Sequence, residues 1–239
     1  TGNIDPHYFV GYSGGSKAVM PGVSSRKSIT ATHSMMLLPG AEVGNISGNP
    51  VRAAIDEIGE DIGVHFILNV ILNEDKQIVG AVAGHHVNAH REGCKIADSM
   101  FKVHLPQPAD IVIVSAGGYP KDINLYQAQK ALDNARLAVK QNGVIILVAE
   151  CREGFGEETF EEWMTSADSP DVIINRMQER FVMGGHKALA VAQTMKKARI
   201  MLVSSIHPDL VRQAMFEASD SVQDALGNVL HSQEGEKSI

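Results

Sequence analysis

Residues 7–17, HYFVGYSGGSK, combine residue types that suit a ligand-binding turn: a histidine, two serines, three glycines and a lysine. Glycine permits positive φ angles and lets the backbone approach a ligand closely. The glycines are Gly11, Gly14 and Gly15. Because His33 follows on a predicted helix that faces back toward this turn, we expect His7, Lys17 and His33 to surround one site. The alternative is that the glycines only make a tight turn.

The same turn contains GYSGG, which satisfies the G-x-S-x-G pattern of a hydrolase with Ser13 as nucleophile. That pattern requires a strong strand before it, and residues 3–10 make a poor one because they contain Pro6. The turn is not a Walker P-loop, since Lys17 follows Ser16 rather than a glycine. A serine hydrolase built on Ser13 is therefore the rival hypothesis, and it needs an aspartate and a histidine downstream.

A second group of histidines lies in GHHVNAH, residues 84–90. His86 and His90 are four positions apart, a spacing that can bind zinc on one face of a helix. No glutamate lies between them and a third ligand is not evident. We therefore expect no metal there, and we predict that His85, His86 and His90 are exposed or cap a helix.

A second candidate site lies in SAGGYPKDINLYQAQKAL, residues 115–132, just beyond a predicted strand. In open α/β sheets, ligands bind at the carboxyl ends of the strands. Asp122 or Asn124 can cap the helix that begins here. Gln127 and Lys130 are three apart and share a helical face, where an amide and a cation suit a small carboxylate. The alternative is an ordinary solvated helix face.

The first part of the chain is predicted to contain short elements. Periodicity and capping residues indicate helices in 23–38, starting near Ser24 or Ser25, in 49–63 and in 87–101. The apolar runs 65–73 and 78–84, separated by polar residues, predict a β-hairpin.

The pattern changes at LPQPAD, residues 105–110, which we interpret as a linker. Strands are predicted at 110–118, 143–150 and 199–205, and helices at 124–141, 157–166, 170–181, 186–197 and 208–226. The first strand is continuously apolar, as expected for a strand buried on both faces. We predict an α/β protein: residues 1–104 form an incomplete α/β domain with a hairpin, and residues 105–239 form a parallel-sheet αβα sandwich. The order of the strands cannot be deduced from the sequence.

Composition limits the classes of function. The formal net charge of −7 argues against a nucleic-acid surface, and no apolar run is long enough for a membrane helix. Two cysteines, Cys94 and Cys151, form no disulfide pattern and fit a reducing cytoplasm. The chain starts at Thr1 and stops at EGEKSI, so we expect a fragment.

Two long stretches, residues 2–33 and 115–132, resemble the lactate racemase family, which uses a nickel-pincer nucleotide. The resemblance implies that Lys17 is joined covalently to this nicotinate-derived cofactor through a thioamide, and that His33 is the fourth ligand of nickel. Sulfur donors and an imidazole suit planar four-coordinate Ni(II). A hydrogen-bond partner on the second ring nitrogen of His33 is expected to orient it. Gly14 and Gly15 would let the chain pass against the flat cofactor.

The resemblance also implies a reaction, the interconversion of the enantiomers of a 2-hydroxy acid, lactate or a relative. His7 would be one of two acid–base groups, while a hydride passes from the substrate to the cofactor and returns to the other face of a transient 2-oxo acid. Tyr126, Gln127 and Lys130 would line the substrate side, with Lys130 offsetting negative charge. The enzymes that make the cofactor are the expected partners.

Two departures qualify this resemblance. Ser16 stands where several members carry a basic residue. The second catalytic histidine and a substrate-binding arginine belong to a part of the family upstream of Thr1, so we expect the fragment alone to be inactive. A non-enzymatic paralogue that binds or stores the cofactor is a further alternative.

Overall fold

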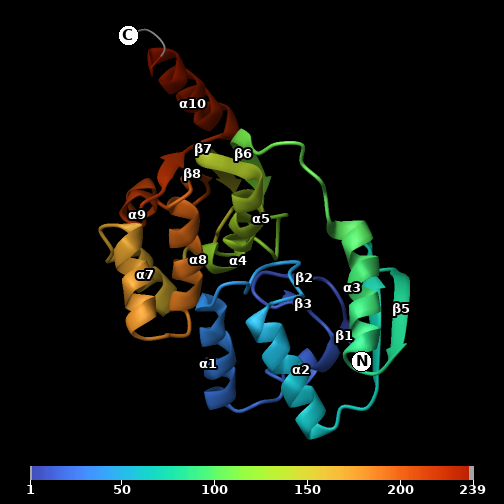
Figure 1. The fold of residues 1–239 in the computed structure, drawn as a ribbon. Helices are drawn as coiled ribbons and strands as arrows, with labels where there is room; N and C mark the ends of the chain where they lie inside the picture. Colours follow the sequence, from blue (N-terminus) through green and yellow to red (C-terminus); the bar gives the residue numbers. More distant parts are fainter. Residues whose placement is uncertain (1, 237–239) are drawn as a thin grey trace. The chain divides into compact units, whose positions relative to one another are not determined.

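The computed structural model describes residues 2–236, with side chains described up to His231. The chain divides into two compact units, residues 1–104 and 105–239 (Figure 1). Each unit has a sheet of its own and helices that pack on it. The predicted α/β class is confirmed.

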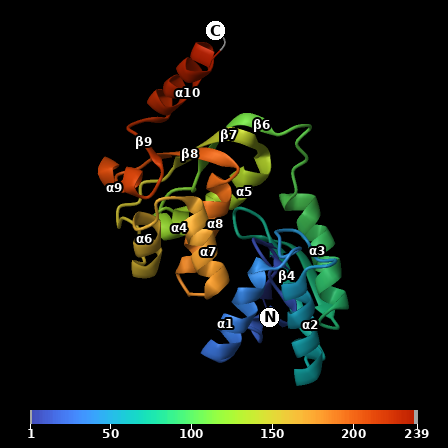
Figure 2. The ribbon, with the colours of Figure 1, turned by 60° about the vertical axis from the view of Figure 1, so that its left-hand side comes forward.

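Unit 1 is built around a small sheet in the order β1-β4-β5. The strands of unit 1, inside and outside this sheet, are β1 (Gly2–Asn3), β2 (Pro6–His7), β3 (Gly11–Tyr12), β4 (Ile67–Leu72) and β5 (Ile78–Gly84). Its helices are α1 (Arg26–Ser34), α2 (Pro50–Ile62) and α3 (Asn88–Phe101), with the 3₁₀ turns η1 (Gly15–Ala18) and η2 (Met35–Leu37). The predicted hairpin is confirmed, because β4 and β5 pair antiparallel, and α3 packs on both strands. Figure 2 shows α3 beside β4.

Two helices of unit 1, α1 and α2, begin where capping chemistry predicts. The Ser25 hydroxyl accepts a hydrogen bond from the backbone N–H of Ser28 and starts α1. Asn49 caps α2 in the same way, and Gly63 ends it in the left-handed conformation, at φ 79°. The predicted helix in 23–38 is shorter than expected, since its last turn tightens into η2.

Two apolar clusters lie in the described part of the core of unit 1. The first joins Ile4, which follows β1, to β3, β4 and α3, and its buried members are Ile4, Tyr12, Ile71, Cys94 and Ala97. The second joins Phe9 and Val10 to Val51 and Ile55 of α2. The chain between β2 and β3 is therefore held against α2 by apolar packing as well as by the polar contacts described below.

Unit 2 contains a four-stranded sheet whose neighbouring strands are all parallel, in the order β6-β7-β8-β9. The strands are β6 (Ala109–Ser115), β7 (Val139–Val148), β8 (Ala198–Val203) and β9 (Glu217–Ser219). The helices are α4 (Leu125–Ala128), α5 (Lys130–Ala138), α6 (Glu158–Thr165), α7 (Pro170–Glu179), α8 (Gly185–Met195), α9 (Pro208–Gln213) and α10 (Val222–Glu236). One face of the sheet packs on Ala225 and Val229 of α10. Ile145 and Leu147, which alternate with the residues on that face, are also buried, so both faces are covered.

Two elements of unit 2 differ from the prediction. The helix predicted at 124–141 is broken at Gln129 and ends at Ala138, and β7 begins at Val139. The polar residues that follow Val139 do not resemble a buried strand. At these residues the β6–β7 pairing is irregular, and Asn142 has a φ of 63°. The predicted helical region 208–226 is interrupted by the short strand β9.

The prediction that the strand at 110–118 is buried on both faces is wrong. Among the described residues, β6 is an edge strand with β7 as its only neighbour, and Ile113 is 50% exposed. A continuous apolar run indicates a strand of a parallel sheet, but it does not specify the position of that strand in the sheet.

Gly59, in the interior of α2, provides a test of this packing. Helix propensity alone favours Gly59→Ala. A Cβ at this position would, however, lie 2.2 Å from Ser16 Oγ and 3.0 Å from His86 Cε1. We therefore expect Gly59→Ala to destabilise the protein by about 1–3 kcal/mol through overpacking, as measured by calorimetric unfolding.

Gly227→Ala is the matched control. Gly227 is also a helical glycine, but a Cβ there meets nothing within 4 Å. This change should leave the stability unchanged or raise it by up to about 1 kcal/mol. Equal gains in stability for the two variants would show that the contact between α2 and the Ser16 turn is absent.

Candidate active site

His7 and His33, which the sequence places far apart, approach the same aromatic ring. Phe9 lies edge-on to His7 with a centroid distance of 4.8 Å, and 5.2 Å from the ring of His33. Phe9 is 3% exposed and is fixed by the core contact with α2. The structure therefore brings the two imidazoles to one buried phenyl group, although β2 carries His7 and the last turn of α1 carries His33.

The orientation of the His33 ring is set by its own helix. Its Nδ1 lies 2.9 Å from the carbonyl oxygen of Ile29, one helical turn earlier. Because a carbonyl oxygen only accepts, Nδ1 carries the proton in this bond and Nε2 is the ring atom with a lone pair. This is the arrangement expected of a metal-binding histidine, in which the second ring nitrogen is held by a hydrogen bond.

Lys17 lies in η1, directly after the glycines, and its side chain is half-buried. Burial lowers the pKa of Lys17, and the charge of Arg52 lowers it further, against a smaller opposing effect of Asp5. A lowered pKa increases the fraction of neutral amine at neutral pH, which is the form that reacts as a nucleophile. The half-buried side chain and its charged neighbour therefore make this lysine suitable for covalent attachment.

The backbone of the turn is held by a buried arginine. Arg52 of α2 is 0% exposed and donates to the carbonyl oxygens of Tyr12 and, at 3.4 Å, Gly14. Asp56, one turn further along α2, lies 3.8 Å from the Arg52 guanidinium and also pairs with Arg91 of α3. A buried charge is costly unless it is paired and hydrogen-bonded, and here the turn itself supplies part of the compensation.

Two more side chains complete the support of this backbone. His90 Nε2 donates to the carbonyl oxygen of Ser13 at 2.8 Å, and the side-chain oxygen of Asn69 accepts from the N–H of Gly15 at 2.8 Å. Burial, reinforced by the charge of Arg52, lowers the pKa of His90 to about 3, so this ring is neutral. Each backbone carbonyl from Tyr12 to Gly14 is thus bound by a side chain of α2 or α3.

The prediction that the histidines of residues 84–90 are exposed or capping is wrong for two of them. His86 and His90 are both 0% exposed, and each bonds to the turn. His85 remains as predicted, exposed and accepting a long 3.4 Å bond from the backbone N–H of Val87. The four-residue spacing of His86 and His90 therefore belongs to two side chains that hydrogen-bond to the same turn.

The packing of the protein explains why the turn contains glycines. Gly14 and Gly15 both have positive φ angles, of 81° and 64°. A Cβ on Gly14 would lie 2.7 Å from Ile4, and one on Gly15 would lie 3.2 Å from the His90 ring. Neighbouring groups of the protein itself therefore require these glycines, whether or not a ligand also passes close to them.

Ser13 does not have the surroundings of a hydrolase nucleophile. Its hydroxyl donates to the carbonyl oxygen of Asn3 at 3.0 Å and accepts from the N–H of Asp5 at 2.9 Å. His90, a nearby histidine, binds the Ser13 carbonyl oxygen and not this hydroxyl. The geometry favours a turn-stabilising role for Ser13.

The second predicted site lies in unit 2, at the start of α4 and α5. Asn124 caps α4 by accepting from the N–H of Gln127, as one of the two predicted caps. Lys130 Nζ donates to the side-chain oxygen of Gln127 at 2.6 Å, so the predicted shared face is confirmed. Tyr126 packs edge-on against Phe160 and His186, and burial raises its pKa.

Asp133, in the first turn of α5, and the buried Lys187 of α8 affect each other's pKa. Burial raises the pKa of Asp133 to about 6 and lowers that of Lys187 to about 8. With its amide oxygen turned toward them, Gln129 accepts from Lys187 Nζ at 3.0 Å and from the N–H of Lys130 at 3.3 Å. The backbone at Lys130 is thus connected to a buried polar group.

Sequence reasoning missed Arg52, Asp56 and Asn69. The only available signal was in α2, where Arg52, Asp56 and Gly59 recur at helical spacing beside the apolar positions. A charged pair on the same helix face as a small residue can indicate that this polar face is buried. The same pattern is equally typical of an exposed polar face.

Comparison with known proteins identifies the family. Residues 1–44 match the lactate racemase N-terminal domain and residues 105–239 match the lactate racemase C-terminal domain. The chain belongs to the lactate racemase family. The predicted resemblance is therefore confirmed.

Two curated lactate racemases are similar to this family member. The protein from Thermoanaerobacterium thermosaccharolyticum is 39% identical over 181 residues, which cover 75% of this chain and 42% of the relative. The protein from Lactiplantibacillus plantarum is 34% identical over 235 residues, which cover 94% of this chain and 54% of the relative. The chain therefore spans about half the length of the lactate racemases it matches.

Solved structures agree with this assignment. The lactate racemase apoprotein from T. thermosaccharolyticum superposes with a TM-score of 0.89 at 33% identity, over 95% of this chain and 56% of that one. A Thermotoga maritima protein, at 20% identity and a TM-score of 0.69, over 92% of this chain and 59% of that one, shares the fold. Within the described residues, no helix has the length and apolar character needed to cross a bilayer.

The lowered pKa of Lys17 can be measured directly. The amine loses its proton at lower pH in the folded protein, so its acylation should reach half-maximal rate at lower pH than in the same protein unfolded in urea. Peptide mass spectrometry of residues around Lys17 gives both profiles. Asp5→Asn should shift the folded profile to still lower pH, since Asp5 raises this pKa. Coincident folded and unfolded profiles would contradict the assigned burial.

Proposed function

We propose that the protein carrying this chain is a racemase or epimerase that interconverts the enantiomers of a 2-hydroxy acid, lactate or a relative. Membership of the lactate racemase family through two matched domains is the observation that supports this most directly. The contacts of His7 and His33 with Phe9 and the lowered pKa of Lys17 are consistent with it. The surroundings of Ser13 give no comparable support to hydrolysis.

The residues of unit 1 fit the nickel-pincer nucleotide implied by the family resemblance. Lys17 is a half-buried amine with a lowered pKa, as a covalent tether requires. His33 has Nδ1 bonded to Ile29, which makes Nε2 the atom that would bind nickel. When bound, this group would supply a nickel-supported carbon able to accept and return the hydride of the substrate.

The protein's own residues would handle protons and charge. His7 would take a proton from the substrate hydroxyl or return it, a role for which an imidazole titrates in the right range. Lys130 and Gln127 would bind the substrate carboxylate, since they already form an ammonium–amide pair on one helical face. Tyr126 would line the same side, with its ring fixed by Phe160 and His186.

The proposal also covers the partners of the protein and its cellular location. The enzymes that synthesise and attach the cofactor would be partners of the protein, and its location would be the cytoplasm. An acidic net charge of −7 supports a small-molecule enzyme over a nucleic-acid-binding protein.

The test uses the full-length polypeptide that carries residues 1–239, expressed with the cofactor-synthesising enzymes. We expect a mass adduct on the peptide containing Lys17, stoichiometric nickel, and conversion of L-lactate or a larger 2-hydroxy acid to its enantiomer. His7→Gln should retain the adduct and nickel but lose about 10²–10⁴-fold in kcat, as expected for removal of an acid–base group.

Three further variants separate the roles. Lys17→Ala should lose the adduct, and His33→Ala should lose nickel while the adduct remains. Lys27→Ala is the matched control, because Lys27 is an exposed lysine on α1. An unmodified Lys17 in the wild-type protein, or activity that survives Lys17→Ala, would refute the proposal.

A further inference from the structure

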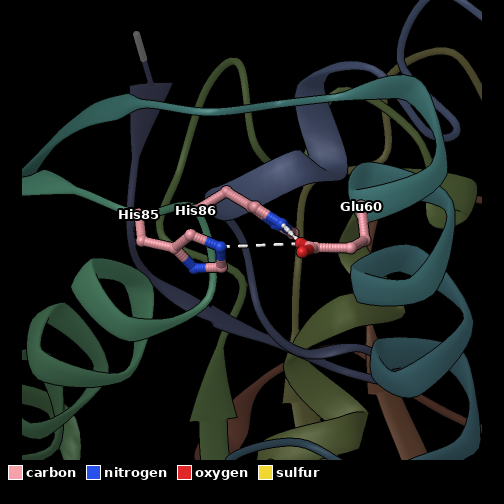
Figure 3. A group of neighbouring side chains, drawn as sticks. All are labelled: Glu60, His85 and His86. Atoms are coloured by element: carbon pink, nitrogen blue, oxygen red, sulfur yellow. Dashed lines mark hydrogen bonds and ion pairs between the residues drawn. The ribbon is translucent and has the colours of Figure 1, made fainter.

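Three potential metal ligands converge on the side of unit 1 where α2 ends and α3 begins. Glu60 Oε2 lies 2.7 Å from His86 Nε2 and 3.5 Å from His85 Nε2, and the three ligand atoms lie within 4.8 Å of one another. Figure 3 shows both imidazoles directed at the carboxylate. In a tetrahedral zinc site with bonds of about 2.0–2.2 Å, neighbouring ligand atoms are separated by distances of this order.

The buried ligand of this group is held in place. His86 is 0% exposed, and its Nδ1 lies 2.8 Å from Ser16 Oγ. A hydroxyl can donate or accept, so this bond persists when the proton of the ring moves from Nε2 to Nδ1. The ring can thus present an Nε2 lone pair to a cation without losing its partner, which is the support that metal-binding histidines usually have.

The other two ligands face solvent and leave a route for an ion. The side chains of Glu60 and His85 are 68% and 46% exposed. His85 accepts a bond of 3.4 Å from the N–H of Val87 at Nδ1, which favours a proton on Nε2. A cation at Nε2 would require that proton to move to Nδ1, which would end this long, weak bond, a small cost compared with a metal–imidazole bond.

We propose that Glu60, His85 and His86 form a binding site for a zinc ion. Two imidazoles and one carboxylate are a zinc donor set that leaves a position for water. The three side chains lie outside the residues assigned to the racemase chemistry, so the proposal goes beyond that function and does not depend on it. It also reverses the expectation of no metal in residues 84–90, since the third ligand comes from α2 and not from the sequence around the histidines.

The site is connected to the turn that carries Lys17. Ser16, the hydrogen-bond partner of His86, is the residue before Lys17 in η1. A metal bond to His86 would fix the ring that Ser16 binds, and would reduce the local opening of η1. We therefore assign to this zinc ion a stabilising effect on the Lys17 turn.

In the direct test, the untagged chain is first treated with a chelator to remove bound metal. Zinc binding is then measured by isothermal titration calorimetry and by metal analysis after desalting. We expect one zinc per chain in the wild type. His85→Gln and Glu60→Gln each remove an exposed ligand and should abolish stoichiometric binding. Ser16→Ala should weaken zinc binding by about 10- to 100-fold, as loss of a partner that orients a ligand does.

The matched controls are Glu57→Gln, an exposed glutamate one turn earlier on α2, and His104→Gln, an exposed histidine. Both should bind zinc as the wild type does. Equal zinc content in the wild type, His85→Gln and Glu60→Gln would overturn the site, and so would an absence of binding in the wild type. These results are independent of any adduct at Lys17 or nickel at His33.

Hydrogen–deuterium exchange tests the coupling to η1. Zinc should slow deuterium uptake in a peptide spanning residues 12–18 of the wild type and leave that of His85→Gln unchanged. Zinc binding without any change in this peptide would overturn the proposed effect on the Lys17 turn.

Discussion

The burial of Arg52 is the constraint on which the glycine turn depends. A guanidinium with no exposed surface must be hydrogen-bonded and paired, and here the carbonyl oxygens of Tyr12 and Gly14 accept from it while Asp56 is its ion-pair partner. Any other path of the turn would leave the charge of Arg52 without these acceptors. Burial is the main cause of the lowered pKa of Lys17, and the charge of Arg52 lowers that pKa further. One buried cation therefore shapes the turn and tunes the amine that the turn presents.

This arrangement changes the meaning of the glycine-rich motif. A short motif of glycines and serines is easily interpreted through the ligand it might contact, or as a nucleophile elbow. Here Gly14 and Gly15 leave room for Ile4 and His90, and the hydroxyl of Ser13 binds Asn3 and Asp5. The motif encodes a rigid turn first. Chemistry at Lys17 can rely on that rigidity, because a reactive group positioned by a fixed backbone loses little entropy when it reacts.

The sequence predicted most elements because local signals determine them. Caps at Ser25 and Asn49, the apolar period of α3 and the alternation of the hairpin are all readable along the chain. The positions of β6 and β9 in the sheet were not, since strand order arises from pairing between distant segments. The site was only half predictable for the same reason: the face shared by Gln127 and Lys130 follows from helical spacing, whereas the burial of His86 and His90 depends on partners far away in the chain.

Both candidate sites use the same construction, in which an exposed or half-buried cation rests on buried polar groups. In unit 1, Lys17 follows a turn held by Arg52 and His90. In unit 2, the N–H of Lys130 is bound by Gln129, which also accepts from the buried Lys187. Burial is the main cause of the lowered pKa of Lys17 and Lys187, and the nearby charges of Arg52 and Lys130, respectively, lower them further. Asp5 and Asp133 oppose these effects, so each of the two lysines is partly compensated by a nearby carboxylate.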